Sequence, residues 1–443
     1  MARRIVATMA LLLTVNANAV SHAPLLDAQA DEHDIILKID PEGGTLAIDD
    51  HWQVRHRDVP DAVSFLLTPL YSKPEIVSIT CGKLRLRTKS VASAVEGGDT
   101  RWTIKLDRPC PPSRRLVIHL RGTSHGDAPQ FKVGSNGAFA GSSGEIWYPQ
   151  HAYSDRERAR ITLTLPGGWT GWAVGQPQKD ASANFVSQAP TKLAFAAGPY
   201  RDYQPDPAVP IRILTREKDV NGLALSGSIA KTFQHLRLIF GPRSTGGFAL
   251  IDVSFGGEVA GTSENGAIFA EPGRMAEAFD VAYWGHEISH QWWGVDVRPK
   301  LGSPGAALLT EALAEYGAMS VIRVERGEPG LEAYRQTQRD RYDKLAASGQ
   351  FRPLASFLPA GQSEPLIAHK LATTRGALAL DCVANLAGRA RFDKVLAGFA
   401  ARWRNQPTSW AALDVELRAK FPEQSATIDQ WLKSSEPELP ICR

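Results

Sequence analysis

The residues that point most directly to chemistry lie between Trp284 and Gly294, in the sequence Trp-Gly-His-Glu-Ile-Ser-His-Gln-Trp-Trp-Gly. His286 and His290 are four residues apart, and side chains with this spacing share one face of a helix. Two imidazoles on one face are a typical pair of zinc ligands. Glu287 follows the first histidine directly, where its carboxylate can take a proton from a water molecule at the metal. The segment therefore predicts a catalytic metal site.

The segment around the histidines is expected to be helical. Residues 276–279 (Ala-Glu-Ala-Phe) favour a helix, and Gly294 is predicted to end it as the C′ glycine. Gly285 weakens a helix by about 1 kcal/mol relative to alanine. We interpret it as a place where another backbone approaches. Because the histidine pattern also occurs in unrelated helices, a second signal is needed.

That second signal is a pair of carboxylates. Glu311 and Glu315 are four residues apart in residues 309–316, Leu-Thr-Glu-Ala-Leu-Ala-Glu-Tyr. Carboxylates beside leucines are costly to bury unless a cation meets them. A solvated acidic face is the alternative interpretation. The position one loop after the histidine pair favours a shared metal ion.

Together the two segments resemble the aminopeptidase N family of zinc peptidases, the gluzincins, with motifs H-E-x-x-H-Q-W-[FW]-G and L-N-E-G-F-A-E-Y. The chain has H-E-I-S-H-Q-W-W-G and L-T-E-A-L-A-E-Y, with twenty residues rather than the usual eighteen between the second histidine and the next ligand. A loop absorbs such an insertion at low cost. The resemblance implies one Zn²⁺ held by His286, His290 and Glu311, with Glu287 as general base. Glu315 is expected to hydrogen-bond a ligating histidine.

The family also has a G-x-M-E-N segment, an edge strand that pairs with the peptide and whose glutamate binds the substrate's α-amino group. Residues 261–265 are Gly-Thr-Ser-Glu-Asn, so Ser263 replaces the methionine. The resemblance implies that Glu264, with Asn265, binds the substrate. Glu258 and a solvated loop glutamate are the alternatives. If Glu264 holds the amine, the enzyme cuts from the N-terminus; otherwise an endopeptidase is possible.

The most serious departure from the family is Thr373, which occupies the position of the tyrosine that stabilises the oxyanion, ahead of Arg375-Gly376 in place of Lys-Gly. Losing one oxyanion donor lowers the rate by about 10²–10³. His369, one turn earlier, is predicted to donate instead. The alternative for His369 is a purely structural role, in which the imidazole is hydrogen-bonded within the fold. Tyr342 is a more remote candidate for the donor.

The rest of the chain divides into a β-rich and a helical part. Between residues 34 and 203, short strand-like runs alternate with clusters of Gly, Pro, Asp and Ser, which predicts a β-sandwich-like domain. Residues 202–210 form a proline-rich linker and the expected domain boundary. Beyond it lie a helical pattern at 219–240, a buried strand at 247–255, and further helices at 328–347, 368–386, 391–403, 410–421 and 428–432.

We therefore predict an α+β multidomain protein. An N-terminal β domain spans residues 20–203, and a mostly helical, thermolysin-like zinc peptidase domain with a helical tail spans residues 204–443. Relatives usually carry a further large C-terminal helical domain, which we expect to be missing here. The cleft is then expected to be more open.

Residues 1–19 predict a cleavable secretory signal, with Arg3 and Arg4, a short apolar core and Ala17-Asn18-Ala19. No later stretch reaches the roughly 20 apolar residues that span a bilayer. The net charge of +3, without a run of like charges, argues against binding to nucleic acid or anionic membranes. We expect a soluble periplasmic or secreted protein.

The four cysteines are even in number, and in an oxidising compartment this favours two disulfides. Sequence proximity favours Cys81–Cys110 and Cys382–Cys442, with free buried thiols as the alternative.

The predicted function is zinc-dependent hydrolysis of peptide bonds by an exported aminopeptidase. A zinc endopeptidase is one alternative. A catalytically weak or inactive zinc protein that binds peptides is the other; Thr373 supports it, and the retention of Glu287 opposes it.

Overall fold

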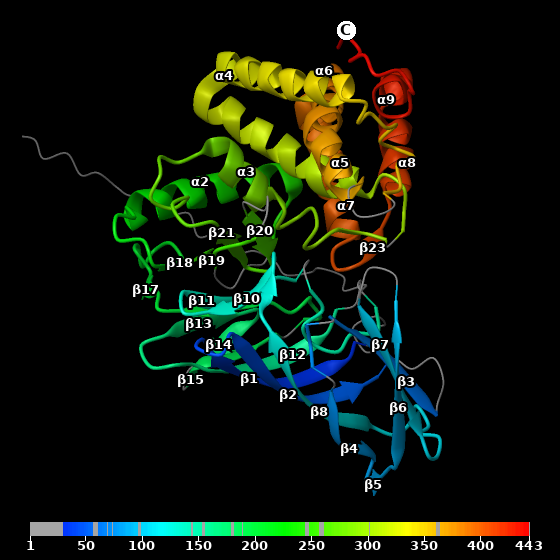
Figure 1. Ribbon diagram of the computed structural model, residues 1–443. Helices are drawn as coiled ribbons and strands as arrows, with labels where there is room; N and C mark the ends of the chain where they lie inside the picture. The colour runs from blue at the N-terminus through cyan, green and yellow to red at the C-terminus, as the bar shows by residue number, and fades with distance from the viewer. Residues whose placement is uncertain are drawn as a thin grey trace, which may run out of the picture.

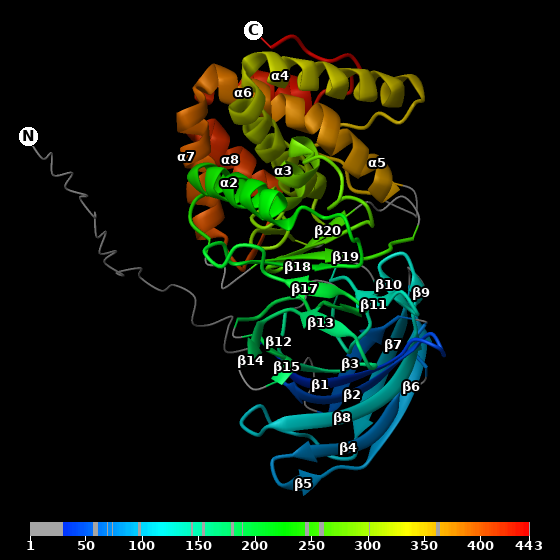
Figure 2. The ribbon, with the colours of Figure 1, turned by 90° about the vertical axis from the view of Figure 1, so that its left-hand side faces the viewer.

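The computed structural model describes residues 30–55, 61–68, 70–72, 74–95, 99–142, 145–152, 156–178, 181–187, 189–243, 248–256, 261–300, 302–359 and 364–442. The predicted signal segment and Glu258 lie outside these residues. In the described part, β-sheets occupy the N-terminal half and helices the C-terminal half, with a small sheet between them (Figures 1 and 2). The predicted α+β fold with a β-rich N-terminal region is confirmed.

The β-rich half contains three sheets, with strand orders β14-β15-β12-β1-β2-β8-β4-β5, β13-β16-β11-β10-β9 and β3-β7-β6. In β1 and β2 every second residue is buried, which is the pattern of a strand with one face against a core. The strands are β1 (Glu32–Asp40), β2 (Thr45–Val54), β3 (Ala62–Leu67), β4 (Glu75–Cys81), β5 (Leu84–Arg85), β6 (Thr88–Ala94), β7 (Thr100–Leu106), β8 (Leu116–His125), β9 (Asp127–Ala128), β10 (Phe131–Gly134), β11 (Gly137–Ala140), β12 (Arg158–Thr164), β13 (Thr170–Ala173), β14 (Gln176–Gln178), β15 (Ala181–Val186) and β16 (Phe195–Gly198).

A five-stranded sheet lies between the two halves, in the order β17-β18-β19-β21-β20. The strands β18, β19 and β21 are parallel neighbours, and β20 pairs antiparallel at the edge. The predicted linker 202–210 begins within β17, so its first two residues are strand, and the remainder joins β17 to β18 within this sheet. A division at residue 203 stays a prediction. The elements are β17 (Arg201–Tyr203), β18 (Ile211–Thr215), α2 (Gly222–Phe240), β19 (Phe248–Asp252), β20 (Gly261–Glu264) and β21 (Ala267–Ala270).

This central sheet is buried on both faces. Leu250 and Ile268 pack into the core of the helical half, whereas Ile251 and Phe269 pack into the core of the β half. Successive strand residues point to opposite faces, so one set of strands supplies both cores. The sheet thereby fixes β20, at its edge, relative to the helices.

The helical half packs α3 against α4 and surrounds them with shorter helices. α4 bends at Gly327, which has φ 69° and lies two residues before Pro329 (Figure 1). The elements are α3 (Val281–Ser289), β22 (Arg298–Pro299), a π-helix (Leu308–Ala312), α4 (Leu313–Ala347), α5 (Glu364–Leu371), a second π-helix (Ala372–Gly376), α6 (Ala377–Ala387), α7 (Arg389–Arg402), β23 (Pro407–Thr408), α8 (Trp410–Lys420), a 3₁₀ turn (Pro422–Gln424) and α9 (Ser425–Leu432).

Two disulfides link the pairs predicted from the sequence. Cys81 at the end of β4 is bonded to Cys110, and Cys382 in α6 is bonded to Cys442 near the C-terminus. The second pair ties the terminal segment to the helical core. Among the described helices, none is both long and apolar enough to cross a lipid bilayer.

Candidate active site

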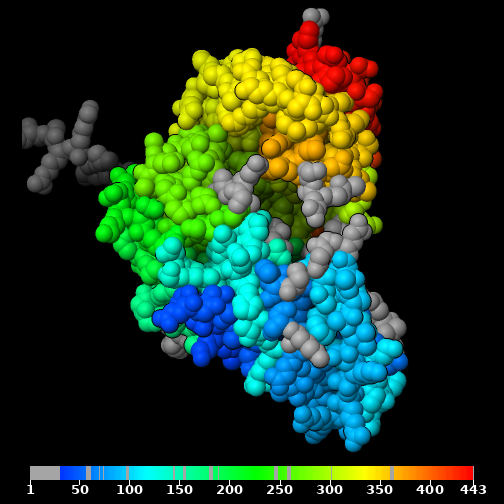
Figure 3. Space-filling model, viewed as in Figure 1, coloured from blue at the N-terminus to red at the C-terminus, as the bar shows by residue number. Residues whose placement is uncertain are grey.

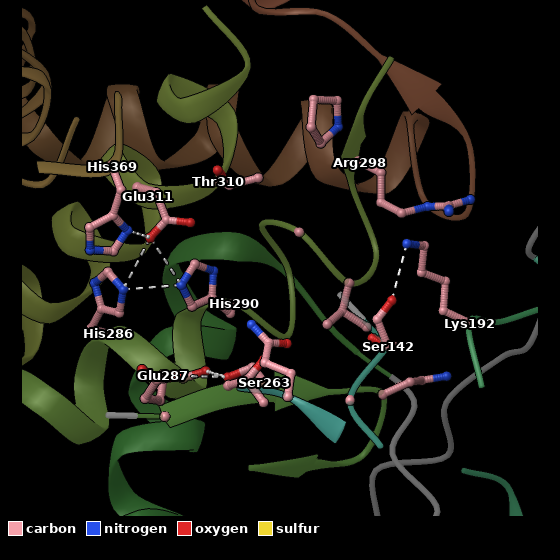
Figure 4. A pocket seen from close by; sticks show the side chains of 18 of the residues that line it. Ser142, Lys192, Ser263, His286, Glu287, His290, Arg298, Thr310, Glu311 and His369 are labelled. Atoms are coloured by element: carbon pink, nitrogen blue, oxygen red, sulfur yellow. Dashed lines mark hydrogen bonds and ion pairs between the residues drawn. The ribbon is translucent and has the colours of Figure 1, made fainter. Parts of the chain in front are cut away.

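The two histidines are carried by α3. Asp280 caps this helix, because its carboxylate accepts hydrogen bonds from the backbone N–H groups of Ala282 (3.0 Å) and Tyr283 (3.2 Å). His286 lies in the last turn, and His290 follows as the C-cap residue, still in helical conformation. Both imidazoles project from the same side of the helix, as their spacing predicts (Figure 4).

Two glycines flank this motif. A Cβ on Gly285 would lie only 3.0 Å from Cα of Ala318 in α4, which confirms the predicted close approach of another backbone. The prediction that Gly294 is the C′ residue is wrong. The helix ends at Ser289, because the N–H groups of Gln291 and Trp292 turn to carbonyls three residues back. Gly294 lies in the following turn with φ 116°.

The carboxylates approach from the start of α4. Glu311 lies in the π-helix Leu308–Ala312, and Glu315 lies in the first turn of α4. A π turn is wider than an α turn and is frequent at functional sites. Oε2 of Glu311 lies opposite both histidine rings (Figure 4).

The three predicted metal ligands form a small triangle. Nε2 of His286 and Nε2 of His290 are 3.0 Å apart, and each lies 3.5 Å from Oε2 of Glu311. A tetrahedral zinc ion with bonds of about 2.05 Å separates its ligand atoms by about 3.3 Å. The two imidazole nitrogens and one carboxylate oxygen therefore fit Zn²⁺ in both chemistry and spacing.

The other nitrogen of each ring is hydrogen-bonded, which fixes the ring orientation. Nδ1 of His286 lies 2.8 Å from Oε2 of Glu315, and Nδ1 of His290 lies 2.9 Å from the carbonyl oxygen of Trp293. Glu315 is itself held by Gln338, whose Nε2 donates to Oε1 at 2.7 Å, and by the hydroxyl of Tyr334. Glu315 therefore makes the hydrogen bond to His286 that was expected from the sequence.

The charges of this cluster depend on one another. Burial opposes ionisation of Glu311, but the nearby His290 and hydrogen bonds from His286, His290 and His369 hold the pKa of this carboxyl well below its usual range. Burial also opposes charge on His286, yet its hydrogen bonds to Glu311 and Glu315 hold the pKa of the imidazole well above its usual range. The partly buried carboxylate of Glu311 thus favours a positive charge beside it, which a divalent cation would supply.

Glu287 is buried between α3 and the edge strand β20. The hydroxyl of Ser263 lies 2.9 Å from Oε2 of Glu287 and 2.7 Å from its backbone carbonyl oxygen, and it donates to one of them. Ser263 stands where the family has methionine, so the departure from the family pattern at this position provides a contact to the predicted base. Sequence reasoning noted the substitution and missed this contact.

His369 and Thr373 both line the same cleft. Nδ1 of His369 lies 3.0 Å from Oε2 of Glu311, so this half-exposed histidine belongs to the cluster. The hydroxyl of Thr373 is 3.1 Å from the carbonyl oxygen of His369 and 3.2 Å from that of Lys370, and it is therefore bonded within its own helix.

Tyr342 is not in the cleft, and its prediction as a remote donor is wrong. Its hydroxyl donates to the carbonyl oxygen of Pro437 and accepts from the guanidinium of Arg375 at 2.8 Å. Arg375, which occupies the lysine position of the family pattern, is fully buried and also donates to the carbonyl oxygen of Glu436. Both side chains hold the C-terminal segment.

Glu264 is buried beneath the cleft at the end of β20. Its Oε1 accepts from the backbone N–H of Ser142 at 2.9 Å, and its Oε2 has no hydrogen-bond partner among the described residues. Burial raises the pKa of Glu264, although Ser142 and the charge of Lys192 act against this. Asn265 lines the cleft. Its side-chain amide accepts a hydrogen bond from the guanidinium of Arg243 and donates one to the hydroxyl of Thr191.

The three proposed ligands, Glu287 and His369 line one cleft of about 1170 Å³ between the two halves, and Glu264 is not among its lining residues. The molecular surface is hollowed at this place (Figure 3). Residues of the β half, of β20 and of the helices line it together. The outer edge of β20 and the ligand triangle therefore face a common space.

The fold of this chain, with the ligand triangle in a cleft between a β half and a helical half, is shared by solved structures of M1 zinc metallopeptidases. No protein-family model matches the chain, and no curated protein does. Solved structures do match it. The M1 zinc metallopeptidase from Deinococcus radiodurans shares 19% identity and a TM-score of 0.70, over 94% of this chain and 95% of that one. A mutant of that enzyme bound to a Tyr-Ser-Ala substrate gives a TM-score of 0.71 at 18% identity, over 94% and 96% of the two chains.

Yeast LTA4 hydrolase in complex with Bestatin has a TM-score of 0.74 at 16% identity, over 93% of this chain and 68% of that one. The chain thus has the M1 peptidase fold, and the resemblance drawn from the sequence motifs is confirmed at the level of the fold.

Proposed function

We propose that the protein is a zinc-dependent peptidase that removes N-terminal residues from peptides. The observation that carries this proposal is the triangle of His286, His290 and Glu311, whose ligand atoms lie 3.0 to 3.5 Å apart in a cleft. Zn²⁺, when bound, polarises the scissile carbonyl and lowers the pKa of a water molecule.

Glu287 is the general base of this proposal. Its carboxylate lines the cleft, one residue after a proposed ligand, and is oriented by Ser263. It takes a proton from the attacking water and returns it to the nitrogen of the leaving amine, so that one C–N bond breaks and one C–O bond forms. A structural zinc site has no use for such a base.

The edge strand β20 is the proposed partner of the substrate backbone, because no other strand of the described residues pairs with its outer edge. Glu264 is the proposed anchor of the substrate's α-amino group. A buried carboxylate oxygen without a hydrogen-bond partner among the described residues is a strong acceptor for an ammonium donor. Asn265, at the end of this strand, shapes the same wall of the cleft.

His369 is the proposed stabiliser of the oxyanion in place of the missing tyrosine. Its ring lies next to Glu311 and lines the cleft, whereas the hydroxyl of Thr373 is bonded within its own helix. An imidazole N–H aimed at a developing negative charge is a known way to lower such a barrier.

Two measurements test this function. Zinc content by mass spectrometry should be one ion per chain, and it should fall in a His290→Ala variant. Hydrolysis of aminoacyl-nitroanilides should exceed that of N-blocked peptides, and it should be lost in Glu287→Gln with zinc retained. Cleavage of the blocked peptides would instead identify an endopeptidase. Bound zinc without turnover would identify a peptide-binding protein.

We also propose that the protein is exported. The two disulfides support an oxidising compartment. N-terminal sequencing of protein recovered from the periplasm or medium should begin after Ala19; intact Met1 in a cytoplasmic fraction would contradict export.

A further inference from the structure

The wall of the cleft across from the metal-ligand triangle is positively charged. Lys192 and Arg298 line it, and their side chains lie together on the far side of the cleft from His286 and His290 (Figure 4). Arg156 lines the cleft as well. We call the wall formed by Lys192, Arg298 and Arg156 the basic wall.

Lys192 lies between β15 and β16 and reaches the cleft from the β half. Its Nζ donates to the carbonyl oxygen of Ser142 at 3.1 Å, and the N–H of the same Ser142 donates to Oε1 of Glu264 at 2.9 Å. Ser142 therefore bridges the ammonium of Lys192 and Glu264, the proposed anchor of the substrate amine. An ammonium has three donors, and among the described residues only the contact to Ser142 uses one of them.

The arginines approach from two directions. Arg298 belongs to the short strand β22, and Arg156 precedes β12 and is held by Oδ1 of Asn405 at 2.7 Å and the carbonyl oxygen of Val295. The nearby carboxylate of Asp296 offsets the charge of Arg156 only in part, and it also lies 3.1 Å from Nε of Arg243 and 3.6 Å from Nε of Arg404.

The cations of the basic wall repel one another. Burial, followed by the charge of Arg298, lowers the pKa of Lys192 to about 8 and that of Arg156 to about 9. The buried carboxylates Glu264 and Glu157 only partly offset this for Lys192. Like charges held together in a cleft attract an anion and concentrate it there.

We propose that the basic wall binds the side-chain carboxylate of the substrate's first residue, so that the enzyme prefers peptides beginning with Glu or Asp. Lys192 of the basic wall and Glu264 both contact Ser142. The side chain of the substrate's first residue extends from the carbon that bears the α-amino group. A substrate whose amine is held by Glu264 would therefore have this side chain near the basic wall. This inference rests on the proposed aminopeptidase function. Lys192 is the central contact, and Arg298 adds a second charged donor.

The test compares glutamyl-nitroanilide with glutaminyl-nitroanilide, which differ in one charge and have nearly equal size. In the wild type, kcat/KM should be at least about tenfold higher for the glutamyl substrate, as expected for charge-assisted hydrogen bonds. Lys192→Met and Arg298→Met should each bring this ratio close to one, and Lys192→Arg should preserve it. Arg326→Met, which removes an exposed cation elsewhere along the cleft, should leave the ratio intact.

Equal kcat/KM values for the two substrates in the wild type would overturn the proposal. So would an unchanged ratio in Lys192→Met. The C-terminal carboxylate of a short peptide is the other anionic group that could bind to the basic wall. A preference for Gln-Ala over its C-terminal amide, lost in Lys192→Met, would assign the basic wall to that group instead.

Failure of the proposed function has a different signature, namely no turnover of any substrate by the zinc-loaded protein. In that case the dissociation constants of Glu-Ala and Gln-Ala, measured by calorimetry on the Glu287→Gln variant, compare the charged with the uncharged first residue. Tighter binding of Glu-Ala, lost on adding Lys192→Met, supports carboxylate recognition by the basic wall. Equal binding of the two dipeptides overturns it.

Discussion

The hydroxyl of Ser263 on the edge strand β20 lies 2.9 Å from Oε2 of Glu287 on helix α3. This contact joins the strand proposed to pair with the substrate to the carboxylate proposed to move the proton. The proposed base is thus in direct contact with the strand proposed to bind the substrate.

Ser263→Ala should lower kcat by about tenfold, since a hydrogen bond to a charged group contributes roughly 1.5–3 kcal/mol. KM should change much less, because the strand edge stays in place. Steady-state kinetics on an aminoacyl-nitroanilide measure both constants, with zinc content as the control. An unaltered kcat would show that the serine does not orient the base.

Glu315→Gln should weaken zinc binding by about 10- to 100-fold, as expected for loss of a carboxylate that orients a ligating histidine. The carboxylate lies 2.8 Å from Nδ1 of His286. Competition with a chromogenic chelator measures the dissociation constant. Glu325→Gln, at an exposed position of the same helix, is the matched control and should bind zinc like the wild type.

His369→Ala should lower kcat by about 10²-fold if its ring stabilises the oxyanion. Zinc should remain bound, because the three ligands of the triangle are intact. Rate measurements paired with metal analysis distinguish the two effects. Loss of zinc together with activity would instead indicate that the contact to Glu311 serves metal binding.

Gly285→Val should destabilise the protein by about 1–3 kcal/mol, the usual range for overpacking. Even a Cβ at this position would be 3.0 Å from Cα of Ala318, a backbone atom of the neighbouring helix α4. Gly227→Ala in α2 is the control, since its Cβ meets open space, and it should stabilise the helix by about 0.5–1 kcal/mol. Denaturant unfolding measures both changes.

The buried pair of His33 and Asp50 predicts a loss of stability at alkaline pH. Their Nδ1 and Oδ2 atoms are 2.8 Å apart. Burial disfavours the imidazolium, but the charge and hydrogen bond of Asp50 outweigh it and raise the pKa of His33 to about 9. Because this lies above the usual 6.5, the contribution is complete below pH 6.5 and is lost as the pH rises through about 9.

A shift of this size corresponds to about 3 kcal/mol at 1.36 kcal/mol per pKa unit. The free energies of unfolding of the wild type and His33→Gln, measured at pH 6 and pH 10, should therefore differ more at the lower pH. A constant difference between the two proteins would exclude the effect.

The sequence predicted the parts of the site that depend on local spacing. His286 and His290 meet because they are four residues apart on a helix, and Glu311 follows in a recognisable segment. The π-helix that carries Glu311 was not predicted, because a wider turn has no distinct pattern of residues. The contact of Ser263 and the basic wall were missed for another reason. Ser142, Lys192 and Arg298 are far apart in the chain, and only the fold brings them to one cleft.

The strands β18, β19 and β21 contribute side chains to two cores at once. Neither half is therefore a self-sufficient module. If residues 30–203 were produced alone, they would expose the apolar surface that Ile251 and Phe269 cover in the whole chain, and heating the intact protein should dismantle both halves in a single cooperative step.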